Sequence, residues 1–274
     1  MSILQGLILG IVQGLTEFLP ISSSAHLVLV PYFLGWDKTI PSEQIFPFGV
    51  LVQLGTLLAV IVYFWKDLMI ILKAWFSGLI QRRPFESAEA RMGWYIILAT
   101  IPAGIFGLLV KKQVEAAFNS PSATGLFLLV TAVFLVVAEI FGKGQRTLTN
   151  IGWLDALIIG LFQAVSIFPG VSRSGSTITG GMLRGLDRPS AARFSFIMSV
   201  PVMLAAGLLS FGDLNGLSSL KSFLPSLLVG FIAAAIFGFL SIRWLLNFLR
   251  TRPLVGFAMY CALLGIITLI VSYA

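Results

Sequence analysis

The chain has 274 residues, of which 58% are hydrophobic and 11% are charged. Its mean hydropathy of +0.99 excludes a water-soluble globular domain and indicates a polytopic membrane protein. The formal net charge of +7 would suit a nucleic-acid-binding protein, but in so apolar a chain the excess of Lys and Arg is explained by membrane topology. We therefore expect no nucleic-acid partner. Cys261 is the single cysteine, which excludes an intrachain disulfide.

Several apolar runs are long enough to cross a bilayer, which takes about 20 residues. They cover 46–65, 92–110, 122–142, 194–211, 225–242 and 254–273. Two further apolar stretches, 3–34 and 153–183, are interrupted by Pro, Ser and Gly, a pattern typical of half-helices that enter the membrane and return. The sequence predicts a single all-α membrane domain over 1–274, with about six transmembrane helices plus two re-entrant broken-helix pairs.

The first interrupted stretch carries polar chemistry in an apolar setting. Its run from Gln13 to His26 reads QGLTEFLPISSSAH and contains a carboxylate, three serine hydroxyls and the only histidine of the chain. Ionisable side chains are costly at membrane depth, so they usually face a partner, a cavity or a substrate. Pro20 followed by Ser22, a natural N-cap, indicates that one half-helix ends here and another begins. Such a break exposes backbone N–H groups, which attract anions.

The two interrupted stretches resemble each other at an ungapped offset of 150 residues. The matching pairs are Leu7 and Leu157, Ile8 and Ile158, Gly10 and Gly160, Gln13 and Gln163, Phe18 and Phe168, Ser22 and Ser172, and Ser24 and Ser174. Weaker echoes pair 103–107 with 234–238 and Gly125 with Gly256. The sequence therefore predicts two repeat halves, 1–145 and 150–274, that hold a site at their interface.

The basic residues predict the orientation of these halves. Most of them can share one side, which is cytoplasmic by the positive-inside rule. The exceptions are Lys38, Lys111, Lys112 and Lys221. With three full spans in each half, the second half runs upside down relative to the first, so the repeat is predicted to have inverted topology. The two broken pairs then enter from opposite faces, both termini lie outside, and the site faces outside.

The second interrupted stretch supplies a fixed positive charge that the first lacks. Its run from Phe168 to Gly181 reads FPGVSRSGSTITGG. Arg173 has a planar guanidinium that matches carboxylate or phosphate oxygens. Gly170 and Gly175 let the backbone approach a ligand closely, as phosphate-binding loops require. The candidate substrate-binding residues are Ser22, Ser24, Ser172, Arg173, Ser174, Gly175, Ser176 and Thr177.

Each polar residue also has a purely structural interpretation. Arg173 would pair with Glu17 as a buried ion pair, and His26 would bond a backbone carbonyl. The serines would only cap helices and satisfy the backbone, which does not prevent them from touching a substrate. Glu139, at a predicted cytoplasmic end of a span, is expected to be solvated.

Together the two polar runs resemble the undecaprenyl-diphosphate phosphatases, also called bacitracin-resistance proteins. Residues 13–26 fit the first motif of that family and residues 169–175 fit its second, and the resemblance covers essentially the whole chain. It implies an integral enzyme of the bacterial plasma membrane that removes the terminal phosphate of undecaprenyl diphosphate, which recycles the lipid carrier for cell-wall synthesis. The implied partners are a prenyl diphosphate lipid as substrate and the membrane lipid. A homodimer is compatible with the sequence.

The resemblance also implies the roles of the site residues. Its motif serine, histidine and arginine correspond to Ser23, His26 and Arg173, which join Glu17 as the candidate catalytic residues. It implies a divalent cation, Mg²⁺ or Ca²⁺, held by Glu17 and Gln13. The family has Glu or Gln at the position of Gln13, so this chain has the variant with one carboxylate fewer. Chemically, Ser23 could attack with His26 as general base, His26 could attack directly, or the metal could activate water.

Other classes of protein compete with this interpretation. Inverted repeats with broken helices are also the architecture of secondary transporters, so a transporter or flippase of prenyl phosphate lipids is the main alternative. An intramembrane serine protease would use a Ser/His pair but would give Arg173 and Glu17 no role. A purely structural membrane protein would not explain polar motifs at both breaks.

Overall fold

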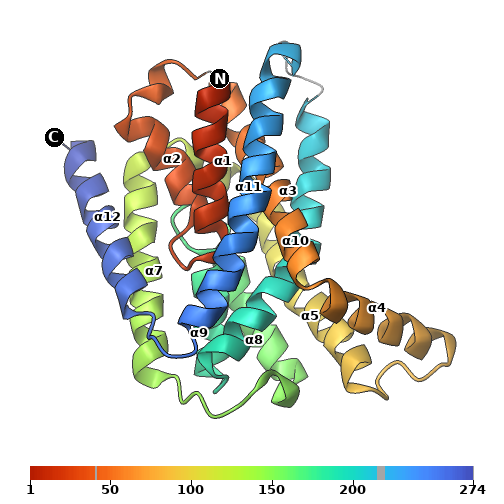
Figure 1. Cartoon of the computed structure of the whole chain (residues 1–274). Coiled ribbons are helices and arrows are strands. Elements are labelled where there is room, and N and C mark those ends of the chain that lie inside the picture. Colours follow the sequence, from red (N-terminus) through yellow and green to blue (C-terminus); the bar gives the residue numbers. More distant parts are fainter. Residues whose placement is uncertain (41, 215–219, 274) are drawn as a thin grey trace.

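All regular secondary structure in the computed structural model is helical over the residues that the structure describes, 1–40, 42–214 and 220–273 (Figure 1). The first half contains α1 (Ile3–Phe18), α2 (Ser23–Phe33), the 3₁₀ turn η1 (Trp36–Lys38), α3 (Ser42–Tyr63), α4 (Trp65–Ile80), α5 (Ala88–Leu109), α6 (Lys111–Phe118) and α7 (Pro121–Phe141). The second half contains η2 (Leu148–Asn150), α8 (Trp153–Val165), α9 (Arg173–Leu183), α10 (Arg188–Leu214), α11 (Leu220–Phe248) and α12 (Val255–Tyr273).

The membrane spans confirm the predicted multi-pass architecture. Five helices are long and apolar enough to cross a membrane alone, namely α5, α7, α10, α11 and α12. The remaining predicted span, 46–65, coincides with α3, but the chain then turns by 79° at Phe64 into α4. The bent pair counts as one further span at most, so the described residues contain five or six spans. The short helix α6 was not predicted, because its polar sequence KKQVEAAF carries no membrane signal.

Both interrupted stretches fold as two helices around a short break, as predicted. α1 ends at Phe18 because Leu19 precedes a proline and adopts an extended conformation with ψ of 141°. Ser22 then caps α2, and its Oγ accepts a hydrogen bond from the N–H of Ala25. In the second stretch Ser172 caps α9 in the same way, by accepting from the N–H of Gly175. The structural role expected of these two serines is therefore confirmed.

The two breaks contain unusual backbone conformations. Ser22 has φ of 67°, in the left-handed region that a serine rarely adopts. Gly170 has φ of 109°, and a Cβ there would lie 2.5 Å from the carbonyl oxygen of Thr124. Only glycine fits that position without moving α7.

Close helix contacts hold the broken helices in the interior. A Cβ added to Gly10 of α1 would lie 2.3 Å from the carbonyl oxygen of Gly230 in α11, so the two backbones touch. A Cβ added to Gly160 of α8 would lie 2.6 Å from the carbonyl oxygen of Ala99 in α5. Each broken pair is therefore fixed against one long helix through small residues. The outer face of α12, by contrast, is apolar and exposed, as expected of a lipid-facing helix.

Arginines gather at one end of the molecule, which we call the basic end. Its members are Arg91, Arg146, Arg184, Arg188, Arg193, Arg243 and Arg250. Ion pairs join several of them to carboxylates: Arg146 and Arg184 to Asp155, Arg188 to Glu139, and Arg193 to Asp67. The start of α1 and the end of α12 lie toward the opposite end (Figure 1). Lys38 also lies there, because Gln5 donates a hydrogen bond to the neighbouring Thr39. The side chain of Lys221 lies outside the described residues.

The predicted solvation of Glu139 is wrong. Its side chain is about nine-tenths buried, pairs with Arg188 and accepts a hydrogen bond from the N–H of Leu254. Arg188 begins α10 and Leu254 precedes α12, so the partners come from segments that are distant in the sequence. Glu139 thereby ties the start of α12 to α7 and α10.

The contact between α1 and α11 yields a test of the packing. We expect Gly10→Ala to lower the unfolding temperature in detergent, because overpacking at a tight contact costs about 1–3 kcal/mol. Gly104→Ala is the control, since a Cβ at Gly104 meets no atom within 4 Å. An equal unfolding temperature for Gly10→Ala and the wild type would contradict the close contact.

Candidate functional site

The breaks of the two interrupted stretches contact each other directly. The N–H of Gly170 donates to Ser22 Oγ at 3.2 Å, and Ser174 Oγ donates to the carbonyl oxygen of Leu19 at 3.0 Å. The starts of α2 and α9 are therefore close together in space, although 150 residues separate them in the sequence. The structure thus brings the two predicted polar runs into one site.

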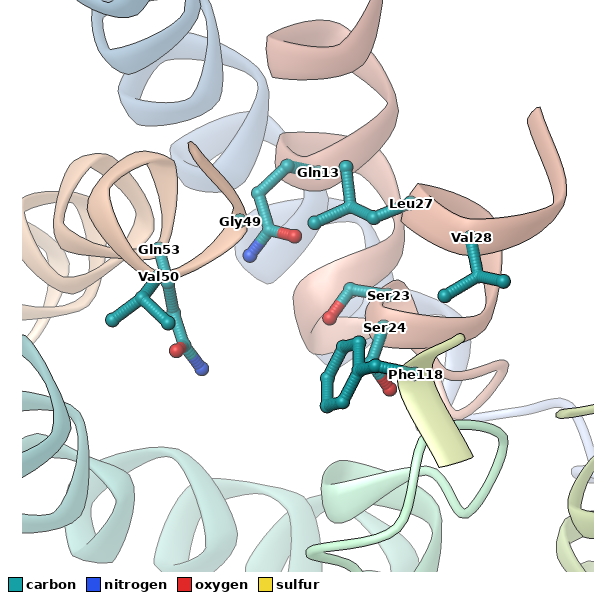
Figure 2. Close-up of a pocket in the computed structure, with 9 residues that line it drawn as sticks. All are labelled: Gln13, Ser23, Ser24, Leu27, Val28, Gly49, Val50, Gln53 and Phe118. Carbon is teal, nitrogen blue, oxygen red and sulfur yellow. The ribbon is translucent and has the colours of Figure 1, made fainter. Parts of the chain in front are cut away.

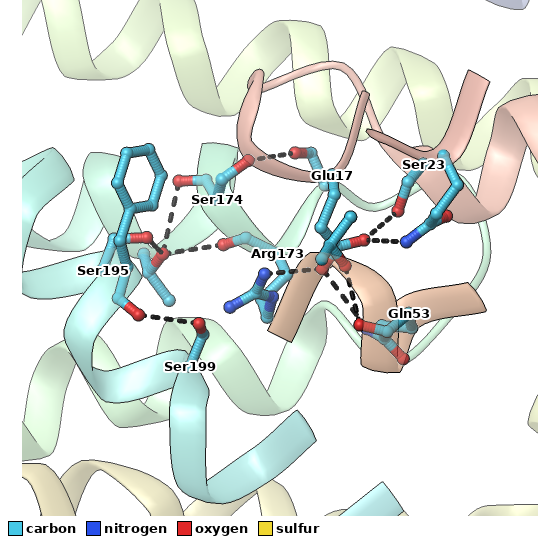
Figure 3. A network of polar contacts seen from close by, with 12 residues as sticks. Glu17, Ser23, Gln53, Arg173, Ser174, Ser195 and Ser199 are labelled. Atoms are coloured by element: carbon cyan, nitrogen blue, oxygen red, sulfur yellow. Dashed lines mark hydrogen bonds and ion pairs between the residues drawn. The ribbon is translucent and has the colours of Figure 1, made fainter. Parts of the chain in front are cut away.

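The carboxylate of Glu17 is the centre of this site (Figure 3). Its Oε1 accepts hydrogen bonds from Arg173 Nη2 at 2.6 Å and from Gln53 Nε2 at 3.3 Å. Its Oε2 accepts from Ser23 Oγ at 2.6 Å and from Gln13 Nε2 at 2.7 Å. Glu17 is only 4% exposed, so this is a buried charge with its partners in place.

Arg173 connects the second break to Glu17. Its side chain is mostly buried, and among the described residues its Nη1 has no hydrogen-bond partner. Thr177 Oγ1 donates to the carbonyl oxygen of Arg173, and Thr177 shares a further hydrogen bond of 2.6 Å with Ser195 of α10. The backbone of Arg173 is therefore anchored, while one guanidinium nitrogen is buried without a hydrogen-bond partner among the described residues.

Aromatic packing anchors the residue next to Glu17. Its neighbour Phe18 is fully buried and meets Phe196 edge to face, with ring centroids 5.2 Å apart. Phe64, which is also buried, packs on Phe196 at 6.4 Å. Phe18, Phe196 and Phe64 therefore form a buried aromatic layer at the end of α1, next to Glu17.

His26 contacts a backbone carbonyl, as its structural interpretation expects, and also Tyr260, which the sequence did not predict. Its Nδ1 lies 2.7 Å from the carbonyl oxygen of Ser22, and its Nε2 lies 2.6 Å from the hydroxyl of Tyr260. Because a carbonyl only accepts, Nδ1 carries the proton, and in the neutral ring Nε2 accepts from the Tyr260 hydroxyl. The two rings are also parallel, 3° apart in orientation. The structural interpretation of His26 is thus present, while the hydroxyl of Ser23 points to Glu17.

A small cavity of about 70 Å³ opens beside Ser23 (Figure 2). Its wall also includes Gln13 and Ser24, together with Gln53 from α3 and Phe118 from α6. The carbonyl oxygen of the Gln13 side chain is buried and has no hydrogen-bond partner among the described residues. The cavity therefore combines an unsatisfied acceptor and two hydroxyls with mostly apolar walls.

The remaining predicted binding residues are buried around the start of α9. Ser172 and Ser174 are buried, and their hydroxyls are 3.2 Å apart. Gly175, Ser176 and Thr177 are buried within α9, where the Ser176 hydroxyl has no partner in the described part of the chain. These residues shape the start of α9, whereas Arg173 is the one that reaches Glu17.

Gln53 and Tyr260 were missed by sequence reasoning. Gln53 is a polar residue inside an apolar span, which is a signal that could have been used. Tyr260 offered no such signal, because tyrosine is common near the ends of membrane helices. Its role depends on the position of α12 beside α2, which only the tertiary structure defines.

The fold and the site define the class: a multi-pass membrane protein with a buried pair of Glu17 and Arg173 where two broken helices meet. A profile of the family described as "Bacitracin resistance protein BacA" matches residues 6–267. Relatives named undecaprenyl-diphosphatase occur in Myxococcus xanthus, 43% identical over 98% of this chain and 89% of the relative, and in Methanosphaera stadtmanae, 42% identical over 99% of both. A third, from Thermomicrobium roseum, is 43% identical over the full length of both chains. The chain belongs to the BacA family, which confirms the resemblance of the two motifs.

The bond between Tyr260 and His26 can be tested because the chain has a single histidine. We expect Tyr260→Phe to speed modification of His26 by diethyl pyrocarbonate about 5-fold, since Nε2 loses a hydrogen bond of about 1 kcal/mol. Ultraviolet absorbance of the modified ring measures the rate. Tyr273→Phe, on the exposed end of the same helix, is the control. Equal rates for both variants would contradict the contact.

Proposed function

We propose that this chain is the membrane hydrolase that removes the terminal phosphate of undecaprenyl diphosphate and yields undecaprenyl phosphate, the lipid carrier used in cell-wall synthesis. Its full-length similarity to proteins named undecaprenyl-diphosphatase supports the activity and the substrate. The observation that carries the proposal is the buried contact between Glu17 and Arg173, which places a phosphate-binding group beside a carboxylate and a hydroxyl.

The diphosphate would bind where the two half-helices begin. The unpartnered Nη1 of Arg173 offers a donor to a phosphate oxygen, and guanidinium binds phosphate well. The N-termini of α2 and α9 add the positive end of two helix dipoles. Preorganised donors of this kind supply most of the catalysis in phosphoryl transfer.

Ser23 is the nucleophile that the geometry favours. Its Oγ would attack the terminal phosphorus while the bond to the bridging oxygen breaks, and the lipid monophosphate leaves. The proton of Ser23 would pass to Glu17, to which the hydroxyl already donates at 2.6 Å. Water would then cleave the phosphoserine and release phosphate. His26 remains the other candidate base or nucleophile, but both its ring nitrogens are engaged.

Alanine substitutions distinguish these roles. In a phosphate-release assay on undecaprenyl diphosphate, we expect Ser23→Ala, Glu17→Ala and Arg173→Ala each to lower kcat by about 10²–10³. Ser87→Ala, which removes the cap of α5 far from the site, is the control. If Ser23→Ala retains turnover while His26→Ala abolishes it, the serine mechanism is wrong. If none of these substitutions changes turnover, the site itself is wrong.

The same assay addresses the transporter alternative, which the broken helices favour. A hydrolase releases phosphate in detergent, where no membrane separates two compartments. Translocation of the lipid without phosphate release would identify the transporter.

The residues present fit a divalent cation that is shared with the substrate. The buried, unpartnered Gln13 Oε1 lies in the same site as the carboxylate of Glu17. The described residues contain no group of three or more His, Cys, Asp or Glu side chains that could hold a metal ion. We therefore propose that Glu17 and Gln13 hold Mg²⁺ or Ca²⁺ with help from diphosphate oxygens and water, as is usual for Mg²⁺. When bound, the cation neutralises the diphosphate charge.

Metal dependence yields a prediction for Gln13. A chelator should abolish phosphate release, and added Mg²⁺ or Ca²⁺ should restore it. Gln13→Glu adds a carboxylate and should lower the half-saturating Mg²⁺ concentration by about 10-fold, since cation affinity rises with ligand charge. Gln13→Leu should raise it, and Gln163→Leu, at the position that matches Gln13 in the second half, is the control. Activity that is insensitive to chelator would remove the proposed cation.

We also propose that the two halves form an inverted repeat. The offset of 150 residues pairs α1 with α8, and the weaker echoes pair α5 with α11. The packing is consistent with this, because α1 contacts α11 through Gly10 while α8 contacts α5 through Gly160.

We propose that the site faces the outside of the plasma membrane. Phe118 of α6 lines the cavity beside Ser23 and precedes α7, whose other end carries Glu139 at the basic end. The cavity therefore lies toward the end away from the arginines, which by the positive-inside rule is external.

A membrane-impermeant inhibitor should act on right-side-out vesicles and fail on sealed inside-out vesicles. The opposite result would contradict this orientation.

A further inference from the structure

A second, larger cavity lies at the basic end and has no role in the proposed reaction. It has a volume of about 960 Å³ and is formed by the junction of α3 and α4 together with α10 and α11. Its charged lining residues are Arg193, Arg243, Arg250 and Asp67. Basic residues thus outnumber acidic ones three to one in its wall.

This cavity is separate from the site around Glu17. The guanidinium of Arg193 lies over the ring of Phe64, 5.7 Å from its centroid. Phe64 packs on Phe196, which in turn packs on Phe18 beside Glu17. All three rings are buried, so they lie between Arg193 and the residue next to Glu17. The cavity at the basic end shares no lining residue with the cavity beside Ser23. A ligand in this cavity would not occupy the proposed reaction centre.

The charges of the cavity suit a phosphate group. Asp67 pairs with Arg193. The Nη2 atom of Arg193 lies 2.7 and 2.8 Å from the two carboxylate oxygens of Asp67. No other carboxylate of the described residues lines the cavity, so the charges of Arg243 and Arg250 exceed the local negative charge. Arg243 and Asn247 are four residues apart and therefore share one side of α11, and Arg250 lies in the turn that follows this helix. All three line the cavity. They form a row of donors that can converge on phosphate oxygens.

The rim of the cavity is suited to a lipid. Trp244 and Leu240 line it from α11, and each is 51% exposed on the surface of this membrane-spanning helix. Tyr63 adds a second aromatic side chain with a polar tip. Tryptophan and tyrosine favour the level of lipid headgroups, and basic pockets between transmembrane helices bind anionic headgroups. A chain attached to a phosphate in this cavity could therefore run along the apolar face of α11.

We propose that this cavity is a binding site for the anionic phosphate headgroup of a membrane lipid, distinct from the site of hydrolysis. Arg243 and Arg250 bind the phosphate oxygens, Asp67 holds Arg193 at the wall, and Trp244 packs beside the upper part of the lipid chain. Two sources share this chemistry, an anionic phospholipid of the bilayer and a prenyl monophosphate. The proposal does not depend on the reaction mechanism.

Native mass spectrometry of the full-length protein in detergent tests the proposal. The probes are phosphatidylglycerol, undecaprenyl phosphate and, as a zwitterionic comparison, phosphatidylcholine. The double variant Arg243→Gln/Arg250→Gln should bind the anionic lipid at least about 10-fold more weakly, because it loses two positive charges and their charge-assisted hydrogen bonds to the phosphate. Arg82→Gln/Arg252→Gln is the matched control, because both arginines are exposed and lie outside the cavity lining. This double variant removes the same amount of positive charge.

The outcomes separate the sources. If the double variant Arg243→Gln/Arg250→Gln selectively loses binding of phosphatidylglycerol, the site is a phospholipid site. If it selectively loses binding of undecaprenyl phosphate, the site is a prenyl phosphate site. Equal weakening in the test and control variants, or equal binding of phosphatidylcholine, would overturn the proposal. Displacement of the lipid by inorganic phosphate at comparable concentration would also overturn it, because the site would then recognise a soluble anion. If the double variant fails to fold, the single variant Arg250→Gln replaces it, because Arg250 lies in an exposed turn. It should also bind the anionic lipid more weakly than the wild type.

Discussion

The buried ion pair between Glu17 and Arg173 is the interaction on which the rest of this structure depends. It joins the end of α1 to the start of α9, two segments that are far apart in the sequence. Removing one partner of such a pair typically costs about 3–5 kcal/mol, because the other charge is left buried without compensation. The structural interpretation of Arg173 does not exclude the proposed functional one, because Nη2 holds Glu17 while Nη1 has no partner among the described residues.

The strained and capped backbone around this pair keeps the site preorganised. Ser22 adopts a left-handed conformation while its hydroxyl accepts from two backbone N–H groups, those of Ala25 and Gly170. One side chain thereby caps its own helix and fixes the other break. Strain of this kind persists only where the surrounding contacts compensate for it, and it is common at functional sites.

The aromatic layer of Phe18, Phe196 and Phe64 separates two different chemical environments. On one side lie Glu17 and Ser23, buried among hydrogen-bond partners. On the other side lie the arginines of the basic end, which line a wide cavity beside the membrane surface. An enzyme that acts on a lipid must handle both an anionic headgroup and a long apolar chain. These two environments suit the proposed substrate and the proposed second lipid site.

The sequence by itself determined the helical membrane class, the positions of the two breaks and the polar residues within them, because hydropathy, Pro20 and the serine caps act locally. It also indicated the family through its two motifs. It did not determine that Glu17 accepts from Ser23, that His26 bonds Tyr260, or that Glu139 is buried against Arg188. These contacts join residues whose separation depends on how the helices pack, and the close approaches at Gly10 and Gly160 set that packing. Only the tertiary structure could decide them, since a hydrogen bond depends on distances of tenths of an ångström that no local pattern encodes.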